Sequence, residues 1–102
     1  MLEFFTAEEA AMATVRQQLE KEMPLIKQRI LHAISKGETC AYYSGTISLA
    51  TKKLLEYGHF KIRRNAYGDF IISWEDPYEQ ICERLSKNEE IIKKLEDFKS
   101  LQ

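Results

Sequence analysis

One apolar stripe runs through the first third of the chain and constrains its fold more than any other feature. Apolar residues recur there at steps of three or four, at Met12, Val15, Leu19, Met23, Ile26, Ile30 and Ile34. This spacing puts them on one side of an α-helix, so it predicts an amphipathic helix that packs by that side. Thr6 and Glu9 have the spacing of a capping box at its start, and Gly37 is typical of the residue just past a helix end.

Pro24 lies inside this stripe. Proline lacks an amide hydrogen, and its ring clashes with the carbonyl four residues earlier. The stripe nevertheless keeps its phase across the proline. Two structures agree with this pattern: one kinked helix, or two nearly collinear helices of which the second has Pro24 in its first turn.

Short β-prone segments follow, separated by a helical one. Residues 39–43 read as a strand, Thr46 or Ser48 can cap a short helix stopped by Gly58, and residues 60–64 and 69–74 read as a hairpin. Alternation assigns one face of the hairpin to the core: Phe60, Ile62, Phe70, Ile72 and Trp74. A helix joins the first strand to the second, so we expect those two to be parallel if adjacent, with a right-handed crossover. The predicted sheet is therefore three-stranded and mixed.

The last quarter of the chain predicts a charged helix. Asp76 suits its cap, Pro77 its first position and Glu79 its capping box, and Ser86 or Asn88 could restart it after a break. We therefore expect a single α+β domain over residues 1–102. It comprises a helical N-terminal segment (1–36), a β-α-β-β unit (39–74) and a C-terminal helix (76–102).

Charge is distributed unevenly although the net charge is only −1. Residues 39–74 hold five basic and two acidic side chains, whereas residues 75–102 hold five basic and eight acidic ones. These two regions would attract each other, within one protomer or between protomers. The apolar runs are too short for a membrane span and no secretory signal precedes the first helix, so we expect neither membrane insertion nor secretion. Cys40 and Cys82 could pair, but two reduced, buried thiols are the favoured interpretation.

Chemistry-bearing residues are sparse. Two histidines and two cysteines are scattered along the chain, so we expect no metal, cofactor or catalytic site. Ser44, Gly45 and Thr46 lie between a strand and a helix, where backbone amides can hold an anion, although an ordinary turn is favoured there. Lys61 and Arg63 alternate with the core-facing residues. They therefore lie on the opposite face of the sheet, with Tyr42 or Tyr43 beside them, and could contact nucleic acid, unless that face is solvated or covered.

The C-terminal helix carries more apolar residues than one face of a small sheet needs. Its stripe predicts a protein interface at Ile91, Ile92, Leu95, Phe98 and Leu101. Packing onto the helix's own domain is the alternative.

Several short motifs resemble a family of small, largely uncharacterised proteins of tailed bacteriophages. They are Thr6-Ala7-Glu8-Glu9 at the start of a long helix, residues 30–38 at its end, the strand at 40–43, Leu54 to Phe60, and Ile71-Ile72-Ser73-Trp74. The resemblance covers roughly residues 5–75 and implies a phage origin without implying an activity. With a phage origin, the expected locations are the host cytoplasm and the virion.

From these observations we expect a non-enzymatic phage protein that acts by protein–protein contact, as a small virion-associated or assembly subunit. Its expected partners are copies of itself or other phage subunits, with no membrane partner. The alternative is a nucleotide- or nucleic-acid-binding module that interferes with a host system. An enzyme is the third choice, because no acid–base constellation can be assembled from the sequence.

Overall fold

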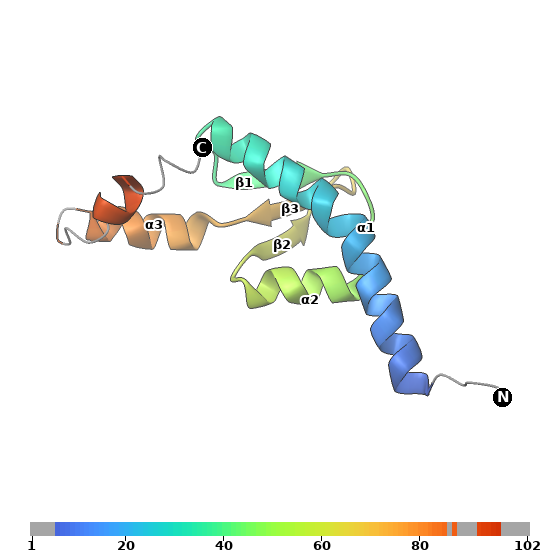
Figure 1. The fold of residues 1–102 in the computed structure, drawn as a ribbon. Helices are drawn as coiled ribbons and strands as arrows, with labels where there is room; N and C mark the ends of the chain where they lie inside the picture. Colours follow the sequence, from blue (N-terminus) through green and yellow to red (C-terminus); the bar gives the residue numbers. More distant parts are fainter. Residues whose placement is uncertain (1–5, 86, 88–91, 97–102) are drawn as a thin grey trace.

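The computed structural model describes residues 6–85, 87 and 92–96, and its fold is α+β as predicted (Figure 1). Residues 92–96 are also helical. The labelled elements follow one another in the order α1 (Ala7–Ser35), β1 (Cys40–Tyr43), α2 (Leu49–Tyr57), β2 (Lys61–Arg64), β3 (Phe70–Ser73) and α3 (Glu75–Arg84).

Helix α1 is continuous through Pro24, which decides between the two alternatives in favour of one helix. It bends along its length in Figure 1, as expected where proline leaves the carbonyl of Glu20 without its helical partner. The predicted cap is confirmed, because the Thr6 hydroxyl accepts a hydrogen bond of 3.1 Å from the amide of Glu9. Gly37 takes a left-handed conformation (φ 75°) just past the helix end, as the sequence predicts.

The sheet is wholly antiparallel, so the prediction of a mixed sheet is wrong. Strand β3 lies in the centre and pairs with β1 on one side and β2 on the other. The two strands joined by α2 are therefore not neighbours. The central position fits the burial of β3: Ile72 lies in the core, and Ile71, on the opposite face, is buried between its neighbours Tyr42 and Arg63 on the two flanking strands.

Helix α2 has two well-defined ends. Ser48 caps it, accepting from the amide of Thr51 at 3.3 Å, which confirms one of the two predicted caps. At the other end the left-handed residue is His59 (φ 69°), one position beyond Gly58. The amides of His59 and Phe60 bond back to the carbonyls of Glu56 and Leu55, a Schellman arrangement that usually has glycine in the place of His59.

A carboxylate joins α1 to α2. The side chain of Glu22 is only 8% exposed, and its Oε1 accepts a hydrogen bond of 2.7 Å from the amide of Ser48. This amide lies at the N-terminus of α2, where the helix dipole favours negative charge. Glu22 therefore supplies an anion from within the chain to the start of α2.

The core lies between one face of the sheet and the two helices α1 and α2. Its buried centre is Ile26, Tyr43, Leu55 and Ile72, with partly buried residues packed around it: Met23, Ile30, Ile47, Phe60, Ile62 and Phe70. Four of the five predicted core-face residues belong to this set. The fifth, Trp74, lies just after β3 and is half-buried, with its ring edge-on to that of Phe60 at a centroid distance of 6.1 Å.

Helix α3 starts earlier than predicted, because Trp74 and not Asp76 is its N-cap residue. The carboxylate of Asp76 instead forms an ion pair with Lys61, with 2.5 Å between Oδ2 and Nζ. The hydroxyl of Ser73 accepts from the first helical amide, that of Glu75, so one free amide is satisfied without a cap from Asp76. Pro77 consequently occupies the third helical position, where no amide hydrogen is needed.

Candidate functional site

One face of the sheet is packed by α1 and α2, and no described helix packs on the other. The pairing register places six residues on this second face, which we call the open face: Cys40, Tyr42, Lys61, Arg63, Ile71 and Ser73. The prediction that Lys61 and Arg63 point away from the core is thus confirmed. The register also identifies Tyr42, and not Tyr43, as the aromatic neighbour, since Tyr43 is in the core.

A short row crosses the open face. Tyr42, Ile71 and Arg63 lie side by side on β1, β3 and β2. Tyr42 is 56% exposed and Ile71 only 7%, so an exposed aromatic ring and a cationic side chain flank a buried aliphatic one. Lys61 is neutralised by Asp76, whereas Arg63 forms no ion pair within the part of the chain that the structure describes. The open face is therefore apolar at its centre and carries its unpaired positive charge at Arg63 of β2.

Helix α3 extends from the end of the sheet without packing on the body. None of its residues is buried. Tyr78, Ile81 and Leu85 follow one another at helical spacing, and we call them the α3 stripe; Tyr78 is 49% exposed and Ile81 38%. Three acidic residues at four-residue spacing, Glu75, Glu79 and Glu83, form a row that begins beside the stripe at Glu75 and turns away from it toward the far side of the helix. This helix thus has an apolar side with negative charge beside it in its first two turns.

The α3 stripe begins next to the open face. Tyr78 lines one groove together with Cys40 and Tyr42, which lie on that face. The hydrogen bond with the Cys82 thiol, one turn further along α3, is the main cause that raises the pKa of Tyr78 above its ordinary value of 10.0. Tyr78 is therefore a neutral phenol at physiological pH. Because Tyr78 lines this groove, the open face and the α3 stripe form adjoining parts of one surface.

The first half of α1 is a second unpacked helix. Residues 7–20, here called the α1 arm, project beyond the sheet (Figure 1), and none of them is buried. Met12 is 67% exposed and Val15 39%. Of the stripe that predicted this helix, only Met23, Ile26 and Ile30 pack on the core.

The predicted C-terminal interface is described only in part. Ile92 and Leu95 are 44% and 48% exposed. Ile91, Phe98 and Leu101 lie outside the described residues. This part of the interface stays a prediction.

Ser44, Gly45 and Thr46 lie in an exposed loop that ends before the Ser48 cap, and the N-terminus of α2 already holds the carboxylate of Glu22. Gly45 packs so closely against Tyr43 that a Cβ at this position would collide with the phenol ring. Ser44 and Gly45 line a shallow groove together with three polar side chains of α1: Gln28, Arg29 and His32. The sequence analysis missed these three, although their spacing on an exposed helix side could have indicated them.

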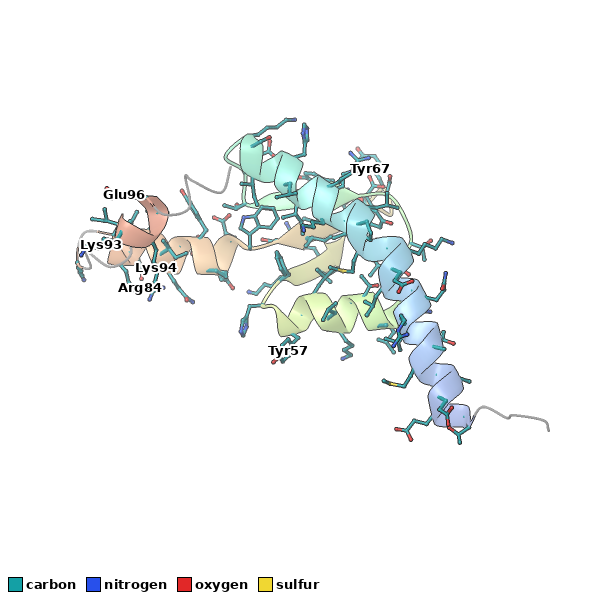
Figure 2. The ribbon with its side chains drawn as sticks, in the orientation of Figure 1. Tyr57, Tyr67, Arg84, Lys93, Lys94 and Glu96 are labelled. Atoms are coloured by element: carbon teal, nitrogen blue, oxygen red, sulfur yellow. The ribbon has the colours of Figure 1, made fainter. Side chains whose placement is uncertain are left out.

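Other chemistry-bearing groups do not converge. Among the described residues, no three His, Cys, Asp or Glu side chains gather as metal ligands would. Both thiols are free, but Cys82 is exposed and Cys40 only half-buried, so the prediction of two buried thiols is wrong. Tyr57 and Tyr67 point into solvent from α2 and from the β2–β3 turn, on separate parts of the molecule (Figure 2).

No helix within the described ranges has the length and apolarity required to cross a bilayer. Comparisons of this chain with protein-family models, with characterised proteins and with solved structures found no match.

Proposed function

We propose that this chain is a non-enzymatic assembly subunit that acts by protein–protein contact and associates with copies of itself. Its setting in a tailed phage, as a virion-associated or assembly component, rests on the resemblance of residues 5–75. The α1 arm is the observation that carries the proposal.

In a monomer, the apolar side chains of the α1 arm are exposed to water, which is unfavourable compared with packing them against a partner. Water surrounds its apolar residues, of which Met12 is two-thirds exposed, and a helix of this kind gains most of its stability by packing an apolar side. The radius of gyration is 17.8 Å, whereas a compact chain of this length has about 13 Å. Such an extended shape buries little surface within one protomer and leaves much of it for a partner.

Charge on the α1 arm favours a second copy as that partner. Glu8, Met12 and Arg16 are spaced four residues apart, so they follow one row along the helix and line the same groove. When two such helices pair antiparallel about Met12, Glu8 of each faces Arg16 of the other. This row is thus complementary to itself under two-fold symmetry, as an isologous contact requires.

Sedimentation velocity over a concentration series tests the proposal. We expect self-association of the full-length protein, weakened by Glu8→Arg, which places like charges together, and restored by adding Arg16→Glu. Gln17→Glu, on the opposite side of the helix, is the matched control and should change nothing. A wild-type protein that stays monomeric at all concentrations would refute the proposal.

Nucleic-acid binding is the second candidate, and the row of Tyr42, Ile71 and Arg63 favours it, because an exposed ring and a cation can hold an unpaired base and its phosphate. The pairing of Lys61 with Asp76 removes one of the two charges it needs. Fluorescence titration with single-stranded oligonucleotides across a salt series tests it. Binding that weakens steeply with salt is expected, and absence of binding at low salt would eliminate it.

A further inference from the structure

We infer that the open face of the sheet is covered by helix α3 of a second copy, in a reciprocal exchange between two protomers. This inference rests on the proposed self-association and adds a contact that does not involve the α1 arm. Four observations carry it: the position of α3, the match in polarity, the match in charge and the continuity of the two surfaces.

Helix α3 cannot cover the open face of its own protomer. Only Trp74 lies between β3 and α3, which is too short a connection for the helix to turn back over the sheet. Two contacts also fix its first turn at the sheet's end: the Thr39 hydroxyl donates to the carboxylate of Glu75, and Lys61 pairs with Asp76. Figure 1 accordingly shows α3 pointing away from the body.

Size and polarity match between α3 and the open face. The ten residues of α3 span about 15 Å, and a four-residue strand spans about 13 Å. The α3 stripe offers an aromatic ring and two aliphatic chains, and the open face offers the exposed ring of Tyr42 next to Ile71, which is already buried in the monomer. A helix with one apolar side and a sheet with one unpacked face are the two halves of an ordinary helix-on-sheet layer.

Their charges are also complementary. Glu79 follows Tyr78 directly and is the middle member of the acidic row, and Arg63 lies on the β2 side of the open face without an ion-pair partner among the residues described. When α3 of one protomer lies with its stripe over Ile71 of the other, one of the two possible directions of the helix axis places the acidic row on the β2 side. The contact would then pair Glu79 of one protomer with Arg63 of the other.

Two-fold symmetry completes the contact. Because Tyr78 lines the same groove as Cys40 and Tyr42, the α3 stripe and the open face adjoin on one side of the molecule. When the open faces of two protomers face each other about a two-fold axis, the α3 of each protomer lies on the sheet of the other. The dimer then contains the same helix-on-sheet contact twice. Such an isologous exchange closes on itself and leaves no half of the surface exposed.

The experiment uses full-length protein carrying Glu8→Arg, so that any contact through the α1 arm is removed from the measurement. We expect this protein still to dimerise in sedimentation equilibrium. Arg63→Glu and Glu79→Arg should each raise the dimer dissociation constant roughly tenfold or more, and the double exchange should restore it. Lys52→Glu, an exposed charge on α2, is the matched control and should leave the constant unchanged.

A dimer whose dissociation constant does not respond to Arg63→Glu, or a Glu8→Arg protein that is monomeric, would overturn the exchange. A wild-type dimer that Glu8→Arg alone converts to monomer would leave the proposed function standing and refute only this inference. Loss of single-stranded oligonucleotide binding on Arg63→Glu, with sedimentation unchanged, would assign the open face to nucleic acid and would also overturn it.

Discussion

Replacing Glu22 by glutamine removes a charge from the junction of α1 and α2 and keeps the size of the side chain. A hydrogen bond to a charged group contributes about 1.5–3 kcal/mol and a neutral one about 0.5–1.5 kcal/mol. The dipole of α2 adds about 0.3–1 kcal/mol in favour of an anion at Ser48. Glutamine avoids burying a charge, which offsets part of this loss. We therefore expect Glu22→Gln to lower the free energy of unfolding by about 1 kcal/mol.

Thermal unfolding followed by circular dichroism, at one fixed protein concentration, measures this effect. A loss of 1 kcal/mol corresponds to a drop in Tm of about 4–8 °C for a domain of this size. Glu20→Gln is the matched control: Glu20 is exposed on the same helix, so its replacement should change stability by less than about 0.5 kcal/mol. If Glu22→Gln is as stable as the wild type, desolvation of the carboxylate outweighs its bond to Ser48, and the reasoning fails.

Three further replacements test local features by the same assay. Trp74→Ala should cost about 2–3 kcal/mol, less than for a fully buried ring, because Trp74 is half-buried against Phe60; a loss below about 1 kcal/mol would contradict that packing. His59→Gly should stabilise the protein by about 0.5–1 kcal/mol, because the left-handed conformation costs histidine more than the extra chain entropy costs glycine, and a loss would show that the ring contributes elsewhere. Gly45→Ala should cost about 1–2 kcal/mol by displacing Tyr43, and an unchanged stability would mean that the loop yields freely.

The fold class and the faces of the strands could be predicted from the sequence, because both follow from local periodicity. Alternation assigned Ile62 and Ile72 to the core and Arg63 to the opposite face. The order of the strands could not be predicted in this way, because alternation says nothing about which strand is central. The burial of both Ile71 and Ile72 fits the central position of β3, and a run of adjacent apolar residues in β3 was the only local signal for it.

The candidate surfaces were harder to predict, because an apolar stripe shows which side of a helix avoids water but not what covers it. The stripe of α1 is uniform from Met12 to Ile34, yet only its part from Met23 to Ile30 packs on the core. Predicting the open face required the pairing register of the strands, which places Tyr42 on that face and Tyr43 in the core. The role of Glu22 had no sequence signal, since it depends on the distant amide of Ser48.

The proline inside α1 has a mechanical consequence. A regular helix is stiff, so a force on the α1 arm is transmitted along the axis to Ile26 in the core. Pro24 has no amide hydrogen, so one backbone hydrogen bond of α1 is missing and the helix bends most easily at this point. Within α1, the angle between the arm and the packed half of the helix is therefore the one that changes most easily. Subunits joined through their arms would adjust this angle, and with it the curvature of the whole array, while the sheet and its packed helices keep their shape.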